Sequence, residues 1–143
     1  MTRIVVESHL TDDLRAAILA PLDRAGREAG ITWSPQPLIL ALRESAGTVV
    51  GGLIGDTNLG WLYVDTLAVV EDLRGQSWGS RLLARAEAIA IERGCRHAWL
   101  NTFSFQARPF YERHGYVAFG ELEDFPPGQS RIFLRKDLTP TTG

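Results

Sequence analysis

Residues 67–83 have the composition of a turn that binds phosphate. An apolar strand pattern ends near Val70, charged residues follow, and small residues around Gly75 and Gly79 begin the strongest helical pattern of the chain. Small residues let a ligand approach the backbone, and the first turn of a helix has unpaired N–H groups and partial positive charge. Arg74 adds a full positive charge beside them. The spacing favours a phosphate or pyrophosphate site about as strongly as a tight strand-to-helix turn without a ligand.

The same turn, Gly75-Gln-Ser-Trp-Gly79, also matches the G-x-S-x-G sequence that carries the nucleophile of serine hydrolases. Those hydrolases have their acid and then their histidine after the serine. Here the first aspartate after Ser77 is Asp124, and the two histidines that follow the serine, His97 and His114, both come before that aspartate. We therefore disfavour a serine hydrolase, and the missing Gly-Lys-Ser/Thr sequence excludes a P-loop.

The composition is typical of a single globular domain. The chain has 143 residues, of which 45% are hydrophobic and 22% charged, and its net charge of −2 argues against a protein that binds nucleic acid. Cys95 is the only cysteine, so neither an intrachain disulfide nor a zinc site with several thiolates is expected, and we predict no metal. The sequence has no secretion signal and no run of about 18 apolar residues. We expect a cytoplasmic protein that does not enter a membrane.

Hydrophobic periodicity predicts an α/β (α+β) fold in which helices flank a mixed sheet. Three central strands form an antiparallel meander, and one helix then crosses back to a following strand. Thr11 is the expected N-cap of the first helix, and Pro21 predicts a kink or a break within it. The predicted strands are 4–7, 38–42, 48–55, 61–70, 97–103, 116–119 and 131–134; the predicted helices are 11–29, 77–93 and 105–114.

Two motifs together resemble the GCN5-related N-acetyltransferase (GNAT) family. The first is the glycine turn, where Arg74 and Gly79 match the family pattern R/Q-x-x-G-x-G/A and Ser77 stands at the usual middle glycine. The second, at 107–116, is similar to A-x-x-x-Y-x-x-x-G-F/Y. The resemblance extends over residues 4–138. It implies one acetyltransferase domain over 1–143, with a mostly antiparallel sheet whose middle strands splay apart and a flexible tail at 139–143.

The resemblance also implies where acetyl-coenzyme A binds. In this family the cosubstrate lies between the splayed strands, so an N–H near Leu67 is expected to polarise the thioester carbonyl. The hydroxyl of Ser77 adds bulk where glycine is usual but removes no backbone donor. The implied cofactor-binding residues are Leu67, Ala68, Val69, Arg74, Gly75, Gln76, Ser77, Trp78, Gly79 and Ser80.

Two further residues are implied as catalytic. Tyr111 is the expected general acid for the departing thiolate, since a phenol has a pKa of about 10; a packing role for its ring is the alternative. Asp65, two residues before Leu67, is expected on the same strand face and is a candidate base acting through water, although an exposed strand aspartate is equally compatible. Ser104 is expected to cap the helix that carries Tyr111.

The sequence thus predicts direct transfer of an acetyl group from acetyl-coenzyme A to a primary amine in a ternary complex. The acceptor is a small molecule or a peptide that the sequence does not identify, and formation of a homodimer is left open. The alternatives are a non-catalytic module that binds coenzyme A or a nucleotide, and a domain that binds a protein partner without a ligand.

Overall fold

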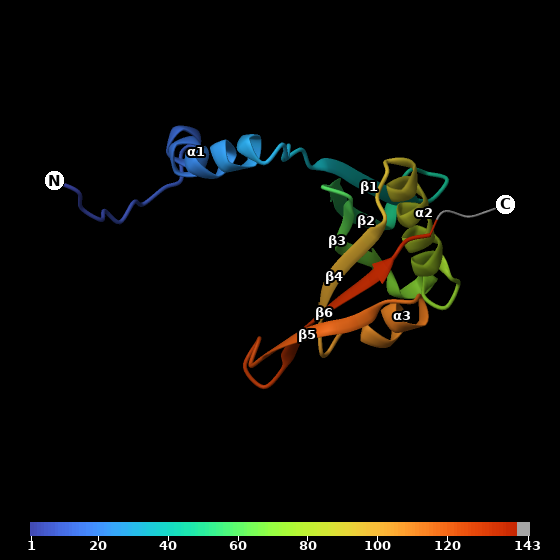
Figure 1. Ribbon diagram of the computed structural model, residues 1–143. Coiled ribbons are helices and arrows are strands. Elements are labelled where there is room, and N and C mark those ends of the chain that lie inside the picture. Colours follow the sequence, from blue (N-terminus) through green and yellow to red (C-terminus); the bar gives the residue numbers. More distant parts are fainter. Residues whose placement is uncertain (140–143) are drawn as a thin grey trace. The chain divides into compact units, whose positions relative to one another are not determined.

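The computed structural model describes residues 1–139, and the chain divides into two compact units, Met1–Trp33 and Ser34–Gly143. The first unit contains α1 (Asp12–Glu28) (Figure 1). Its N-cap is Thr11, as predicted, and the Thr11 hydroxyl oxygen accepts a hydrogen bond of 3.1 Å from Leu14 N–H. The helix continues through Pro21, so the alternative of two short helices is wrong.

Residues 4–7 form no strand, which corrects the prediction of an opening strand. An isolated Ile-Val-Val run has β propensity, but a strand also needs a neighbour with which to pair. The single-domain assignment of residues 1–143 stays a prediction. Most of the predicted flexible tail, residues 140–143, lies outside the described residues.

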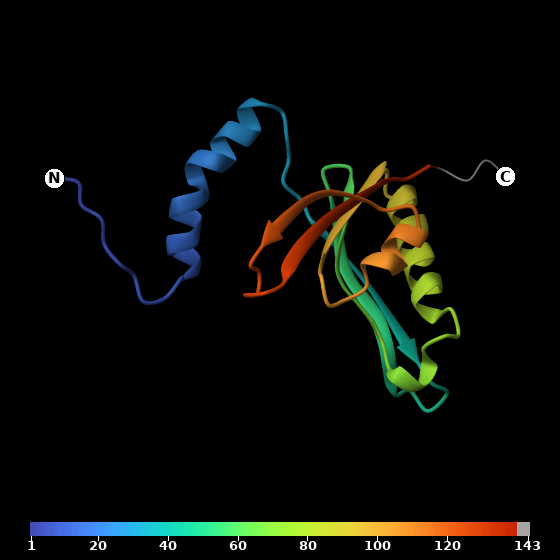
Figure 2. The ribbon, with the colours of Figure 1, turned by 90° about the horizontal axis from the view of Figure 1, so that it is seen from below.

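The second unit is built on a six-stranded sheet in the order β1-β2-β3-β4-β6-β5. All neighbouring strands are antiparallel except β3 and β4, which are parallel, so the predicted mixed, mostly antiparallel sheet is confirmed. The two α-helices of this unit, α2 and α3, lie on one face of the sheet (Figure 2). The strands are β1 (Gln36–Arg43), β2 (Val49–Asn58), β3 (Trp61–Val69), β4 (His97–Phe103), β5 (Val117–Glu123) and β6 (Ser130–Asp137); the helices are the short 3₁₀ helix η1 (Glu71–Leu73), α2 (Trp78–Glu92) and α3 (Arg108–Arg113).

The core lies between α2 and the sheet. One apolar face of this helix is buried, at Leu82, Leu83, Ala86 and Ala90. Ala86 follows Leu82 and Leu83 by four and three positions, and Ala90 follows Ala86 by four, so the buried residues form one stripe along the helix. Burying the stripe fixes α2 across the strands, and that contact determines where its amino end lies.

The middle strands of the sheet splay apart. The parallel pairing of β3 with β4 has four residue pairs, from Trp61 with His97 to Val64 with Leu100, although both strands continue beyond the last pair. The splayed middle strands implied by the family resemblance are therefore present. Beyond Val64, the edge of β3 that faces β4 has no strand partner in the described structure.

Sequence patterns placed some boundaries wrongly. Strand β4 has the predicted bounds, whereas α3 begins three residues later than predicted, at Arg108 with Ala107 as its N-cap. Ser104 is therefore no helix cap; its hydroxyl donates to Gln129 Oε1 and accepts from Ser130 N–H. The Ser104 side chain thus joins two loops and does not make the predicted capping contact with the following helix.

No helix within residues 1–139 has the length and apolar character needed to cross a membrane. The same residues contain no group of three or more His, Cys, Asp or Glu side chains placed to hold a metal ion.

Candidate active site

A cavity of about 360 Å³ lies at the amino end of α2. It is bounded by the end of β3, the glycine turn, the first turn of α2 and side chains of α3. Its lining combines backbone, apolar groups and two arginines, which suits an elongated anionic ligand with an apolar portion. The lining residues are Val69, Leu73, Arg74, Gly75, Ser77, Trp78, Gly79, Ser80, Phe110 and Arg113.

The turn before α2 requires left-handed backbone at two positions. Gly75 has φ of 81° and Ser77 has φ of 66° with ψ of 14°. Glycine adopts this conformation freely, whereas a side chain makes it unfavourable by about 1–2 kcal/mol. Ser77 occupies the N-cap position of α2 but makes no side-chain capping hydrogen bond. Its hydroxyl and the N–H groups of the first helical turn therefore remain available to a ligand.

Two guanidinium groups line this cavity. Arg74 comes from the turn, and its Nε donates to the Val69 carbonyl oxygen at 3.3 Å, which holds the side chain against the end of β3. Arg113 comes from α3, on the other side of the cavity. Together with the amino end of α2 they surround the cavity with positive charge that a phosphate group would meet.

Phe110 of α3 and its C-cap residue, His114, contact two small residues in the first turn of α2. A Cβ added at Gly79 would lie 3.5 Å from the Phe110 ring, an ordinary contact distance, and the backbone of Gly79 is not left-handed. Ser80 Oγ lies 2.9 Å from His114 Nε2. The histidine thus contacts Ser80 rather than Ser77, which agrees with rejecting the hydrolase interpretation.

Near the end of β3, backbone N–H groups point toward the side on which β4 no longer pairs with this strand. Val70 N–H donates to the Val50 carbonyl at 2.9 Å, so at this position the backbone points toward β2. Hydrogen-bonding direction alternates along an antiparallel strand. The N–H groups of Leu67 and Val69 therefore point away from β2, on the side where pairing with β4 ended at Val64.

Tyr111 is 8% exposed and packs its ring edge-on against Phe110 and Tyr116, with ring centroids 5.1 and 5.9 Å away. Burial raises the pKa of its phenol above the ordinary value. No group within residues 1–139 forms a hydrogen bond with the hydroxyl, yet it is not among buried polar atoms without a partner. The ring is therefore fixed while the hydroxyl reaches an accessible surface, although Tyr111 does not line the cavity itself.

Asp65 occupies a β-bulge, which interrupts the regular alternation that its predicted orientation assumed. Val64 pairs with Gly55 and Leu67 pairs with Leu53, so three residue steps on β3 match two steps on β2. Leu67 therefore shares the face of Val64, and Asp65 is the extra, exposed residue. Counting two residues per face assumed a regular strand, so the shared face of Asp65 and Leu67 stays a prediction. Asp65 is nevertheless the first residue after the pairing of β3 with β4 ends.

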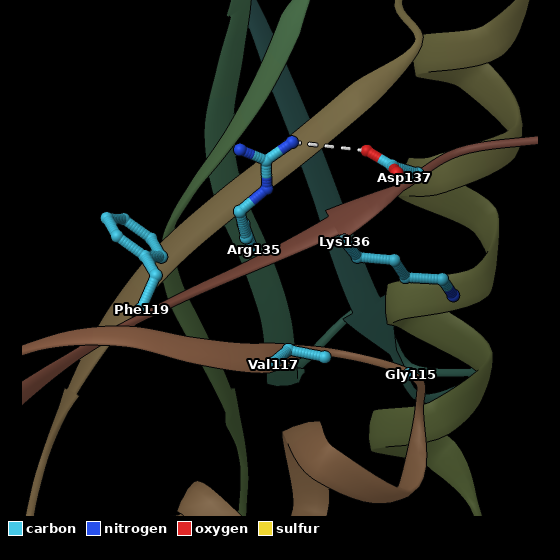
Figure 3. Close-up of a pocket in the computed structure, with 6 residues that line it drawn as sticks. All are labelled: Gly115, Val117, Phe119, Arg135, Lys136 and Asp137. Carbon is cyan, nitrogen blue, oxygen red and sulfur yellow. Dashed lines mark hydrogen bonds and ion pairs between the residues drawn. The ribbon is translucent and has the colours of Figure 1, made fainter.

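A second cavity, of about 480 Å³, lies between the beginning of β5 and the end of β6 (Figure 3). Its charged groups are already paired: Asp137 accepts from His97 Nδ1 at 2.8 Å and from Arg135 Nη2 at 3.3 Å. These two contacts, His97 first, lower the pKa of the Asp137 carboxyl. Lys136 extends from the same segment toward α2 (Figure 3), where its ammonium pairs with Glu87 at 2.8 Å. This cavity contains none of the residues predicted to be functional.

The structure thus gathers most of the predicted binding residues at one place. Val69, Arg74, Gly75 and the segment 77–80 line the first cavity, whereas Leu67, Ala68 and Gln76 do not. Sequence reasoning missed Leu73, Phe110 and Arg113 as lining residues. The signal for the last two was their position beside Tyr111 in the second motif, which places them on the same short helix.

Comparisons with known proteins agree with this geometry. The model of the acetyltransferase (GNAT) family matches residues 6–116. An acetyltransferase of Agrobacterium fabrum is 42% identical over 99 residues, covering 69% of this chain and 72% of the relative. The blasticidin-S acetyltransferase of Streptomyces morookaense is 45% identical over 93 residues, covering 64% and 68%. The crystal structure of an acetyltransferase from Bacillus cereus superposes with a TM-score of 0.82 at 32% identity, covering 94% of this chain and 98% of that one.

Proposed function

This chain belongs to the GNAT family of acetyltransferases, and on that premise we propose that it transfers acetyl from acetyl-coenzyme A directly to a primary amine of a small molecule. Transfer takes place in a ternary complex, without an acetylated enzyme. The relative named blasticidin-S acetyltransferase supports a small molecule over a peptide as the acceptor.

One observation carries the proposal: a cavity with two arginines at the amino end of α2 adjoins the end of β3, whose edge toward β4 has no strand partner beyond Val64 in the described structure. The pyrophosphate binds the N–H groups of the turn and first helical turn, beside Arg74 and Arg113. The pantetheine arm continues along the free edge of β3. There the N–H of Leu67 donates to the thioester oxygen and stabilises the negative charge that develops on it.

The reaction needs two proton movements. The acceptor ammonium first loses a proton, and the neutral nitrogen attacks the thioester carbonyl carbon. The C–N bond forms, the C–S bond breaks, and the nitrogen gives up a second proton to water or a base. The departing thiolate takes a proton from Tyr111, whose raised pKa keeps the phenol protonated at neutral pH, and solvent restores that proton.

Asp65 is the proposed base, acting through a water molecule. Its support is its position as the first residue beyond the last β3–β4 pair, on an exposed bulge that water reaches. Asp65→Asn should lower kcat at neutral pH. The kcat of the variant should return toward that of the wild type as the pH approaches the pKa of the acceptor amine, because less of the amine then needs deprotonation. A kcat deficit that is the same at every pH would exclude this role.

The test of the proposed function combines binding and turnover. Calorimetry should show a 1:1 complex with acetyl-coenzyme A, and a panel of primary amines should include at least one that releases free thiol and forms an acetamide. Double-reciprocal plots that intersect, rather than run parallel, would support the ternary complex over an acetyl-enzyme. Binding without transfer to any amine would instead favour the non-catalytic module, and absence of binding would reject both.

A further inference from the structure

A cluster of aromatic rings surrounds one arginine on the face of the sheet opposite α2. The guanidinium carbon of Arg131 lies 5.0 Å from the ring centroid of Phe125, 5.5 Å from that of Phe133 and 5.7 Å from that of Phe103. Phe105 stacks on Phe103 with centroids 5.4 Å apart and ring planes within 1° of parallel. Guanidinium groups and aromatic rings attract one another through the ring quadrupole, so the cluster is a preformed, flat-sided surface.

The cluster lies beside the separation of the central strands. Phe103, its member on β4, comes three residues after Leu100, the last β4 residue to pair with β3. Phe103 pairs with Arg131 across β4 and β6. The neighbouring pair, Thr102 and Ile132, is buried on the face that α2 covers. Because side chains alternate along a strand, Phe103 and Arg131 point to the opposite face. They therefore stand where an acceptor would approach the thioester from the side opposite α2.

Arg131 has unused hydrogen-bonding capacity. Its Nε donates to Asn101 Oδ1 at 2.8 Å, which leaves the two terminal nitrogens of the guanidinium without a hydrogen bond to any residue in 1–139. No carboxylate in that part of the chain lies within ion-pair distance of Arg131, whereas Arg135, on the same face, pairs with Asp137. A guanidinium held in a ring cluster without a carboxylate matches an anionic group of a ligand, which it would bind through two parallel hydrogen bonds.

The exposed rings are held in place by loop contacts. Phe105 is 60% exposed and Phe125 is 40% exposed. They belong to the β4–α3 and β5–β6 loops, which are joined by hydrogen bonds from Ser104 N–H to the Ser130 carbonyl at 2.8 Å and from Ser130 N–H to Ser104 Oγ at 3.0 Å. A planar group that covers these rings removes apolar surface from water without first ordering the loops.

We infer that the acceptor is a primary amine that also carries a carboxylate, which pairs with Arg131, and a planar ring, which stacks on Phe105 and Phe125. The inference rests on the proposed function, since it names the acceptor class of the same acetyltransferase site. The nitrogen becomes acetylated and coenzyme A leaves as a thiol, while the carboxylate and the ring only bind.

Matched amines test the two binding groups separately. 4-(Aminomethyl)benzoate is compared with its carboxamide, and L-phenylalanine with L-phenylalaninamide, so that charge changes while shape is kept at two spacings. 4-(Aminomethyl)cyclohexanecarboxylate replaces the flat ring by a puckered one. We expect kcat/KM to favour the carboxylate at least tenfold over the carboxamide in one pair, and the aromatic over the saturated ring.

Variants locate the preference. Arg131→Gln should bring the carboxylate-to-carboxamide ratio to about one, and Arg131→Lys should keep part of it because the charge remains. Arg135→Gln is the matched control on the same face and should leave the ratio unchanged. Equal use of carboxylate and carboxamide by the wild type, or an undiminished ratio in Arg131→Gln, would overturn the inference. The inference would also be overturned if Arg131→Gln changed the oligomeric state, measured by sedimentation, and left the selectivity unchanged.

A binding experiment separates this inference from the proposed function. The probe is 4-(acetamidomethyl)benzoate, the expected product, titrated against its carboxamide in the presence of coenzyme A. Tighter binding of the carboxylate that disappears in Arg131→Gln supports the inference even if no amine is acetylated. Transfer to amines without preference for either group would leave the acetyltransferase function intact and reject the acceptor class.

Discussion

At the scale of single residues, Tyr111 has the surroundings of a fixed proton donor. Its ring is buried between Phe110 and Tyr116, and no described group forms a hydrogen bond with its hydroxyl. Tyr111→Phe keeps the ring and its packing and removes only the proton. Since general acid catalysis contributes about 10²–10⁴ in rate, we expect kcat to fall by a factor in that range while the Kd of acetyl-coenzyme A stays unchanged.

A thioester with a better leaving group is the control for that experiment. An acyl donor whose thiol is more acidic needs less protonation, so the difference between Tyr111→Phe and the wild type should shrink. Thermal melting should show equal stability of the two proteins. A stable variant with nearly full turnover would mean that Tyr111 is a packing residue and that water protonates the thiolate.

The tyrosines also predict how stability responds to alkaline pH. Burial raises the pKa of Tyr111, and burial together with the Glu87 carboxylate raises the pKa of Tyr116. Because both values are higher in the folded protein, their contribution to stability is complete below the unfolded value of about 10 and is lost as pH rises beyond it. Urea unfolding should therefore show a decline above about pH 10 that is smaller in Tyr116→Phe. An equal decline in both proteins would contradict the assignment.

Arg74 and Arg113 should contribute to affinity rather than to chemistry, because both line the cavity at the amino end of α2. Replacing either with alanine should raise the Kd of acetyl-coenzyme A about tenfold, equivalent to about 1.4 kcal/mol. The single-turnover rate at saturating cosubstrate should remain that of the wild type. Arg108→Ala is a control on the same helix, since Arg108 pairs with Glu112 and does not line the cavity. A loss of single-turnover rate with binding intact would contradict the placement.

At the scale of elements, the beginning of α2 contains a removable strain. Ser77 adopts φ of 66°, where glycine is usual in the family pattern. Ser77→Gly should raise the free energy of unfolding by about 1 kcal/mol, because relief of the left-handed conformation exceeds the greater freedom of glycine in the unfolded chain. Chemical unfolding measures the change. A destabilised Ser77→Gly protein would show that the serine side chain stabilises the turn through contacts that exceed its strain.

Elements with a full hydrophobic period were predictable, and features set by distant pairing were not. Helix α2 was found within one residue of its predicted bounds at each end, because Leu82, Leu83, Ala86 and Ala90 recur at helical spacing. The bulge at Asp65 was not visible in the sequence, since it arises from the register of β3 against β2. Residues 4–7 had strand composition but no partner, and Ser104 had the type of an N-cap but bonded to the β5–β6 loop instead.

The candidate site shows the same division. The glycine turn, Arg74 and Tyr111 were identified because two linear motifs carry them. Arg113 was not identified from the sequence, because its place in the cavity depends on how α3 packs beside α2. The four rings around Arg131 come from three separate segments of the chain, so no local pattern could have indicated them.

At the scale of the whole molecule, binding of the cosubstrate must raise the free energy of unfolding, because a ligand that binds only the folded chain shifts the unfolding equilibrium. At a free acetyl-coenzyme A concentration of 100 times its Kd, the gain is about 2.7 kcal/mol. For a core of this size we expect a rise in Tm of about 10 °C. The rise belongs to the transition of the second unit, Ser34–Gly143, which contains the cavity.

Substitutions at Gly79 test whether that stabilisation comes from the assigned cavity. Gly79→Asp places a carboxylate beside the expected phosphates, and like charges there should abolish the rise in Tm. Gly79→Ala is the matched control: its Cβ would lie at an ordinary 3.5 Å from Phe110, so the variant should fold and respond to the cosubstrate like the wild type. If the aspartate variant melts at the wild-type temperature without ligand and rises as far with it, acetyl-coenzyme A binds elsewhere. If the alanine variant also fails to respond, the backbone at Gly79 must approach the ligand more closely than a methyl group allows, and charge is not the cause.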